Sequence, residues 1–337
     1  MLHYKNFQYM KQLLVCILLV SSTHISLCQA PFIFTVKGKL EVEKLGFALP
    51  HEHVMSNFGA DPEISAQYDN RAVLKQVVPY LNKLKSLGVK SIFDGTAAYF
   101  GRNAALLKSI STQTGIHIIT NTGFYGAAED RYVPNFAYKA SVDSIANVWV
   151  DEFKNGIDST EIRPGFVKLA FDAGRPSKID LKLFEAGVLT HLETGLTLAV
   201  HTGNNLKAVR RQFALLKKHG VSPTALIWIH ANKSDNDRQL LSVASSGAWV
   251  SLDGVDPYNI DEYVDRIALF KKNFLLHKVL LSHDGNSFPR GAAIRQYHAI
   301  AEILLPKLRE LGYSEAEIHQ LTVENPRNAY TVRVRSL

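Results

Sequence analysis

The sequence predicts an α/β protein that folds as a (β/α)8 TIM barrel with a short N-terminal hairpin. From about residue 45 to the end, short apolar runs rich in β-branched or aromatic residues alternate with amphipathic stretches. Eight such repeats over about 290 residues favour a parallel sheet closed into a barrel. The alternative is an open doubly wound sheet, which would need a glycine-rich phosphate loop after an early strand, and the sequence has none.

The eight predicted strands are short enough to be buried strands rather than helices. They are Phe47 to Val54, Ser91 to Ala97, His117 to Tyr125, Gly165 to Phe171, Leu196 to His201, Ala225 to His230, Trp249 to Asp253 and Lys278 to Asp284.

Helical periodicity fills the segments between these strands. Apolar residues recur at helical spacing, with a glycine after two of the three shorter segments: Leu74, Val77, Val78, Leu81 and Leu84 before Gly88; Leu206, Val209, Phe213 and Leu216 before Gly220; and Ile267, Phe270 and Phe274. We also expect a longer helix from Gly291 to Leu311, ended by Gly312, and a hairpin over Phe32 to Glu43 that turns near Gly38.

Residues 1–30 differ from the rest and read as a secretory signal peptide. Lys5 and Lys11 precede an apolar run over residues 13–20, and the segment ends at Cys28-Gln29-Ala30. The apolar run is too short to span a bilayer, so we expect no permanent membrane span. Bulky Leu27 disfavours a lipoprotein site at Cys28. The prediction is therefore a secreted or periplasmic protein.

Residues 31–337 are predicted to form one domain. Both cysteines, Cys16 and Cys28, precede it, so the mature chain would contain no disulfide. Its 36 basic and 31 acidic residues, counted without Lys5 and Lys11, give a modest positive charge. No Lys/Arg block is interleaved with aromatic residues, and we therefore expect no nucleic-acid partner.

Polar residues with metal-ligand chemistry recur at or near the C-terminal ends of the predicted strands, where the active sites of such barrels lie. They are His51 and His53 on one face of the first strand, Lys168 on the fourth, His201 on the fifth, His230 on the sixth and Asp284 on the eighth. Singly, a strand-end histidine is more often a hydrogen-bonded core residue, and the aspartate a helix cap. An ammonium at Lys168 is costly unless it is paired. Six such residues together favour a metal site.

Neighbouring titratable residues are excluded by their position. His283 should face the helices, Glu52 points away from the two first-strand histidines, and His117, His191, His219 and His277 lack the strand-end position.

These residues resemble those of the phosphotriesterase-like branch of the amidohydrolase superfamily. The resemblance runs from Thr35-Val36-Lys37-Gly38, through Gly46-Phe47-Ala48-Leu49-Pro50-His51-Glu52-His53, to Glu324-Asn325-Pro326-Arg327, with family-like segments at Asp94-Gly95-Thr96, Gly101-Arg102 and Thr122-Gly123-Phe124-Tyr125. It covers nearly the whole mature chain.

The resemblance implies two divalent metal ions and a role for each ligand. His51, His53 and Asp284 would bind the more buried ion, His201 and His230 the more exposed one, and Lys168, carboxylated by carbon dioxide, would bridge both. Imidazole and carboxylate ligands suit zinc, and also manganese, cobalt or iron. A hydroxide bridging the metals would attack the substrate, and Asp284 would take or pass on its proton. Tyr125 resembles a tyrosine that lactonase-like members place over the metals.

The sequence departs from the family pattern at two places. Lys233 stands three residues after His230, where the family usually has an aspartate, and Ser234 to Asp237 reads as a helix capping box. Gly254 replaces the histidine or arginine that usually follows the seventh strand. Because of these changes, the usual residues for the proton exit route and for contacts to the leaving group are missing. The segment after Asp284 is shorter than in relatives, which predicts a more open pocket that Arg131 and Tyr132 could reach.

Three functions follow as hypotheses. The first is hydrolysis of a small-molecule lactone or carboxylic ester by a metal-dependent enzyme, and the second is phosphotriester hydrolysis in the same site. The third is a non-catalytic ligand-binding barrel, which Lys233 and Gly254 alone favour, because no metal ligand is lost. The resemblance also implies a homodimer.

Overall fold

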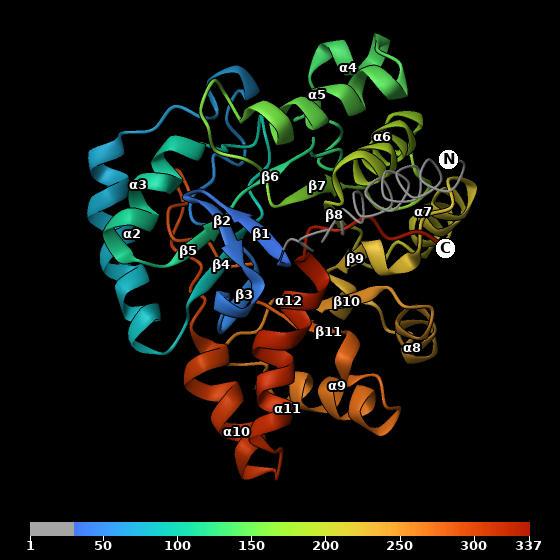
Figure 1. Ribbon diagram of the computed structural model, residues 1–337. Coiled ribbons are helices and arrows are strands. Elements are labelled where there is room, and N and C mark those ends of the chain that lie inside the picture. The colour runs from blue at the N-terminus through green and yellow to red at the C-terminus, as the bar shows by residue number, and fades with distance from the viewer. Residues whose placement is uncertain (1–29) are drawn as a thin grey trace, which may run out of the picture. The chain divides into compact units, whose positions relative to one another are not determined.

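Parallel strands form the centre of the computed structural model, which describes residues 30–337 (Figure 1). The predicted signal peptide, apart from Ala30, and both cysteines lie outside the described residues, so the signal peptide stays a prediction. Among residues 30–337, no helix combines the length and apolar character needed to cross a membrane.

The barrel strands follow one another in chain order, as a (β/α)8 barrel requires. Parallel pairs join β3-β4-β5 and β6-β7-β8-β9-β10-β11. Only Thr120 separates β5 from β6, which together supply the third of eight strand positions, and the predicted fold class is confirmed. The strands are β3 (Ala48–Glu52), β4 (Ser91–Asp94), β5 (His117–Ile119), β6 (Asn121–Thr122), β7 (Phe166–Ala170), β8 (Thr197–His201), β9 (Leu226–Ile229), β10 (Trp249–Leu252) and β11 (Val279–Leu281).

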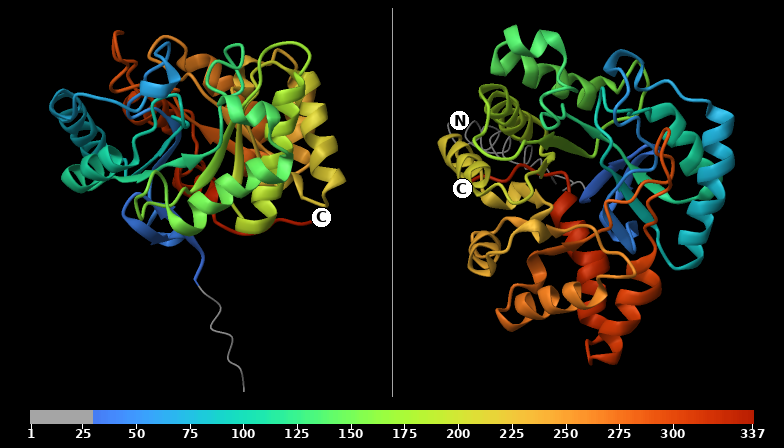
Figure 2. Two further views of the ribbon diagram at one scale, coloured as in Figure 1. Left: turned by 90° about the horizontal axis from the view of Figure 1, so that it is seen from above. Right: turned by 180° about the vertical axis from the view of Figure 1, so that it is seen from behind.

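Helices surround this barrel, and Figure 2 shows them on its outside in two further views. Each strand buries one face against them and the other inside the barrel. The helices are α2 (Asn70–Ser86), α3 (Ala104–Thr114), α4 (Asn135–Lys139), α5 (Val142–Asn155), α6 (Lys178–Thr194), α7 (Leu206–Lys218), α8 (Asp237–Ser245), α9 (Ile260–Lys272), α10 (Leu305–Glu310), α11 (Glu315–His319) and α12 (Asn325–Tyr330). Two π-helical turns, η6 (Ile300–Leu304) and η7 (Gln320–Glu324), lead into α10 and α12, and shorter 3-10 turns are η1 (Val42–Lys44), η2 (Pro62–Ile64), η3 (Pro223–Ala225), η4 (Ala231–Lys233) and η5 (Leu276–Lys278).

Apolar side chains fill the N-terminal half of the barrel interior. Phe93 stacks on Tyr330 with ring centroids 4.0 Å apart, and the Tyr330 hydroxyl donates to the Pro50 carbonyl at 2.8 Å. The predicted hairpin is present as β1 (Phe32–Thr35) and β2 (Gly38–Glu41), and its Ile33 joins this core. Because the bottom is packed with apolar groups, polar chemistry is confined to the C-terminal ends of the strands.

The longer helix predicted from Gly291 to Leu311 is wrong in its first part. Residues 285–298 run irregularly, and helical structure begins only at about Ile300. The backbones of Asn286 and Arg295 exchange two hydrogen bonds of 2.7 and 3.1 Å, an antiparallel pairing that a helix cannot contain. The apolar spacing of this segment therefore misled the prediction.

The capping box predicted at Ser234 to Asp237 is also wrong. The α8 helix begins later, and its N-cap is Asn236, whose side-chain oxygen accepts from the Gln239 amide at 3.1 Å. Ser234 instead accepts from the Asn236 amide at 3.3 Å. Asn is as good an N-cap as Ser, so Asn236 can cap the helix in place of Ser234.

The barrel closes between β11 and β3 through a buried carboxylate. Glu52 is fully buried and accepts hydrogen bonds from the Ser282 hydroxyl at 3.0 Å, the Gly285 amide at 2.7 Å and both the amide and the ring of His283 at 3.0 and 2.6 Å. The other ring nitrogen of His283 accepts from the Ile300 amide at 3.1 Å. Nδ1 therefore carries the proton that His283 donates to Glu52. As predicted, Glu52 and His283 are structural, and they fix the segment that carries Asp284.

We expect Glu52→Gln to lower the free energy of unfolding by about 3 kcal/mol, because an amide group would face donors that need an acceptor. Urea denaturation measures this. The matched control is Glu310→Gln at a side chain that is 70% exposed, which should change stability by less than about 0.5 kcal/mol. Equal stabilities of Glu52→Gln and the control would contradict the role of Glu52 in fixing the segment that carries Asp284.

Candidate metal centre

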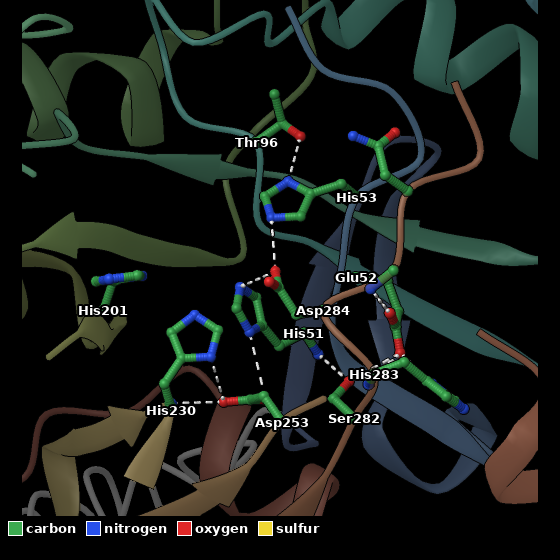
Figure 3. A network of polar contacts seen from close by, with 12 residues as sticks. His51, Glu52, His53, Thr96, His201, His230, Asp253, Ser282, His283 and Asp284 are labelled. Carbon is green, nitrogen blue, oxygen red and sulfur yellow. Dashed lines mark hydrogen bonds and ion pairs between the residues drawn. The ribbon is translucent and has the colours of Figure 1, made fainter. Parts of the chain in front are cut away.

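All six predicted ligands meet at the C-terminal ends of the barrel strands, where they line one cavity of about 330 Å³. His51 lies in β3, Lys168 in β7 and His201 at the end of β8, while the others follow their strands directly or within three residues: His53, His230 and Asp284. Figure 3 shows Asp284 beside the rings of both His51 and His53.

The ligand atoms face one another at short distances. The Lys168 Nζ lies 3.0 Å from His51 Nε2, and Asp284 Oδ1 lies 3.3 Å from His53 Nε2 and 3.8 Å from His51 Nε2. The rings of His201 and His230 are 4.5 Å apart between centroids, and those of His51 and His230 are 5.1 Å apart. Lys168 and Asp284 therefore both lie close to His51, and His201 lies beside His230.

Thr96 fixes the proton of His53. Its hydroxyl donates to the Met55 carbonyl at 2.8 Å, so at its 2.8 Å contact with His53 Nδ1 it must accept. The proton of a neutral His53 then sits on Nδ1, and the lone pair of Nε2 faces the cavity. This is how metal-binding histidines are usually oriented.

Asp253 orients two further histidines, a role that the sequence analysis did not assign. Its Oδ1 lies 3.3 Å from His51 Nδ1, and its Oδ2 accepts from the His230 amide at 2.6 Å and lies 3.6 Å from His230 Nδ1. Its place at the end of the seventh strand, beside the odd Gly254, was the available signal. Ser251 donates to the same carboxylate at 2.8 Å.

The four histidines are held neutral, which a metal ligand requires. Burial, followed by the charge of Lys168, holds the pKa of His51 well below its usual range, and burial followed by the charge of His230 does the same to the pKa of His201. Burial lowers the pKa of His53, and lowers that of His230 to about 3.

The Lys168 amine is buried without a carboxylate partner. Its residue is 1% exposed, and within residues 30–337 no carboxylate oxygen lies within 4.0 Å of Nζ. Burial lowers the pKa of Lys168 to about 8. The salt bridge that would have explained this lysine structurally is therefore not found in the described residues.

A cation fits this set of groups. With its proton on Nδ1, His53 presents a lone pair to the Asp284 carboxylate, and two lone pairs at 3.3 Å repel unless a positive charge lies between them. Asp284 would supply a carboxylate to such a cation beside neutral imidazoles, as in a metal site.

Two ligands adopt backbone conformations that side chains rarely tolerate. His230 and Asp284 have φ angles of +59° and +53°, in the left-handed region. Such residues persist only where the surroundings determine them, and they cluster at functional sites. The Asp253 carboxylate holds the His230 amide, and Glu52 holds both neighbours of Asp284.

Gly95 makes room for the histidine rings. A Cβ there would lie 2.8 Å from His51 Cδ2 and 3.3 Å from His53 Cε1. The segment Asp94-Gly95-Thr96 therefore serves the site twice, since the glycine gives space and the threonine orients His53.

Tyr125 lies at the edge of the cavity. Its hydroxyl is 3.2 Å from His201 Nδ1, and its ring packs on Phe100 with centroids 5.1 Å apart. Arg131 and Tyr132 instead support the loop after β3, through the carbonyl and the amide of Gly59 at 2.7 and 2.6 Å. They do not line the cavity.

One departure from the family pattern, Gly254, lies beside Asn232, which is the chain neighbour of the other departure, Lys233. Lys233 is exposed and lies outside the cavity lining, while its neighbour Asn232 accepts from the Asp253 amide at 3.1 Å. Asn232 also donates to the Tyr263 hydroxyl at 3.2 Å, and that hydroxyl donates to the Asp253 carbonyl at 2.5 Å. A Cβ at Gly254 would lie 3.2 Å from the same hydroxyl. Asn232 and Tyr263 thus support Asp253 beside Gly254.

The geometry defines a barrel with a cluster of potential metal ligands, and comparison with known proteins gives its family. Residues 31–330 match the phosphotriesterase family, and the chain belongs to it. A phosphotriesterase homology protein of Escherichia coli is 30% identical over 85% of this chain and 98% of its own length. An aryldialkylphosphatase of Saccharolobus solfataricus is 25% identical, over 88% and 98%.

A solved structure described as the molecular engineering of organophosphate hydrolysis activity from a weak promiscuous lactonase template superimposes with a TM-score of 0.80. It is 26% identical to this chain and covers 89% of it and 99% of its own length. The relatives therefore include both organophosphate hydrolysis and lactonase activity, and they do not select one substrate for this protein.

We expect Thr96→Val to weaken metal binding about 10-fold to 100-fold, because His53 loses the partner that sets its tautomer. Chelator competition with a zinc indicator measures this. Thr114→Val is the matched control, since Thr114 is equally buried and its hydroxyl also donates to a carbonyl, that of Ile110 at 2.9 Å, away from the site. Equal metal affinities in the two variants would refute the role of Thr96.

Proposed function

We propose that this protein is a binuclear-metal hydrolase that cleaves a lactone or a carboxylic ester. The observation that carries the proposal is the convergence of four neutral imidazoles, one carboxylate and one unpaired lysine amine on a single cavity.

The proposed assignment follows the contacts. His51, His53 and Asp284 have ligand atoms within 4.8 Å of one another and would hold one divalent ion. His201 and His230 would hold the second. Imidazole and carboxylate donors favour zinc, with manganese, cobalt or iron as alternatives.

Lys168 would bridge the two ions as a carbamate. Its neutral amine attacks carbon dioxide, the N–C bond forms and the nitrogen releases one proton, which leaves an anion with two oxygens. A lowered pKa makes the neutral amine available near pH 8. An anion also resolves the cost of burying an unpaired ammonium at this position.

When bound, the ions would supply a water-derived nucleophile near neutral pH and polarise the substrate's carbonyl or phosphoryl oxygen. Asp284 is placed to accept the proton of that nucleophile, because its side chain is 30% exposed at the cavity floor. Tyr125 is placed to donate a hydrogen bond to the substrate from the side of His201. Phe58 and Phe100 supply an apolar wall.

The lactone or ester is the first choice because Tyr125, whose hydroxyl lies 3.2 Å from His201 Nδ1, resembles the tyrosine that lactonase-like members of the family place over the metals. A phosphotriester is the second candidate, because a curated relative is an aryldialkylphosphatase and the same nucleophile can attack phosphorus. A purely ligand-binding barrel is disfavoured, since no predicted ligand is missing or displaced from the cavity.

Parallel rate measurements on the zinc- or manganese-loaded protein test the choice. A panel of γ- and δ-lactones and aryl carboxylic esters is compared with an aryl dialkyl phosphotriester. We expect the highest kcat/KM on a lactone or ester, and a loss of about 100-fold in Asp284→Asn. A strong preference for the phosphotriester would reject the lactone assignment, and no turnover on any substrate by a fully metal-loaded protein would reject the enzyme.

A further inference from the structure

Two arginines line the cavity from the loop that follows the eighth barrel strand. Arg290 and Arg295 both border it, and both are exposed. Arg295 is the better placed, because its Nη2 lies 3.7 Å from Asp284 Oδ2 with a side chain that is still 57% exposed. The proposed reaction assigns neither residue a role.

This loop is held firmly although it has no regular secondary structure. Asn286 fixes the backbone of Arg295 with two hydrogen bonds, and the Arg290 amide donates to the Ser56 carbonyl at 3.1 Å. The Asn286 side chain donates to the Ser56 hydroxyl at 2.6 Å. Each arginine is therefore anchored at its own backbone, so that only its flexible side chain reaches over the cavity.

The cavity has an excess of positive charge. Asp284 is the only acidic residue among those that line it, whereas Arg290 and Arg295 are both basic. Asp284 is also the only carboxylate within 4.0 Å of the Arg295 guanidinium in the described chain, and no such carboxylate is found for Arg290. A site that engages Asp284 with a cation would leave Arg295 free to bind another anion.

The distances set where that anion would lie. The 3.7 Å contact places the Arg295 guanidinium beside a residue of the ligand cluster, and Arg290 precedes it in the same loop and borders the same cavity. A substrate that presents its scissile carbonyl to the cluster would direct its other end towards these residues. Ala292 and Ala293 also border the cavity, where a short aliphatic chain of the substrate would lie.

We propose that the substrate carries an anionic oxyanion group, a carboxylate, sulfonate or phosphate, at the end remote from the scissile bond, and that Arg295 binds it with support from Arg290. Guanidinium groups bind such oxyanions through paired charge-assisted hydrogen bonds. The inference rests on the proposed hydrolase and narrows its substrate class to acidic lactones or esters.

Binding of simple probes to the metal-loaded protein tests the anion site separately from catalysis. Pentanoate, pentanesulfonate and the uncharged pentanamide are titrated calorimetrically into the wild type, Arg295→Met, Arg295→Lys and Arg290→Met, with metal content measured in each. Arg210→Met on the outer helix α7 is the control for a lost arginine charge, because Arg210 is exposed and does not line the cavity.

We expect both anions to bind the wild type at least about tenfold more tightly than the amide, and to lose about tenfold in Arg295→Met. Arg295→Lys should lose less, Arg290→Met should lose a smaller factor, and Arg210→Met should match the wild type. Equal binding of pentanoate to the wild type and Arg295→Met would mean that the metals alone hold it, and would overturn the proposal. Equal binding of anion and amide to the wild type would overturn it as well.

Kinetics separate this proposal from the one on which it rests. Two γ-lactones are compared whose side chains end in a carboxylate or in the matching primary amide. A lower KM for the carboxylate, raised by Arg295→Met, supports both proposals. Lactone hydrolysis without that preference rejects the anion site alone. Arg295-dependent binding of pentanoate by a protein that hydrolyses nothing in the panel rejects the hydrolase and leaves the anion site standing.

Discussion

Repulsion among buried lone pairs is the constraint on which the site depends. His53 presents a bare Nε2 to the Asp284 carboxylate at 3.3 Å. Burial favours the neutral form of each imidazole, so the groups cannot relieve this repulsion by protonation near neutral pH. A divalent cation between them does relieve it, and the same cation supplies the hydrolytic chemistry.

Holding such a cluster together requires a rigid surround. Asp253 aligns His51 and His230, and Thr96 sets the proton of His53. Glu52 accepts hydrogen bonds from the backbone amides on both sides of Asp284. Asn232 and Tyr263 in turn hold the Asp253 backbone. These partners explain how left-handed conformations persist at two ligands, and they tie the site to the closure of the barrel.

The fold and the ligand cluster were predictable because they follow from periodic patterns. Apolar strands alternate with amphipathic helices, and ligand residues recur at strand ends, so that the barrel topology brings distant residues together. The orienting residues were harder to find. Asp253 and Thr96 act through contacts between residues of different strands, which no local pattern encodes. The segment of residues 291–298 has apolar spacing that suits a helix, but the backbone of its Arg295 bonds to Asn286. This segment carries Arg295, and Arg290 directly precedes it; the proposed substrate class rests on these two arginines.

Metal content per chain is the measurement that tests the central claim most directly. Elemental analysis of protein purified without chelator compares the wild type, Lys168→Ala and the exposed control Lys108→Ala. The account predicts about two divalent ions per chain in the wild type and the control, and a sharp fall in Lys168→Ala with its fold retained by circular dichroism. Fewer than one ion in the wild type, not restored by zinc or manganese with bicarbonate, or full occupancy in Lys168→Ala, would contradict a lysine-bridged metal pair.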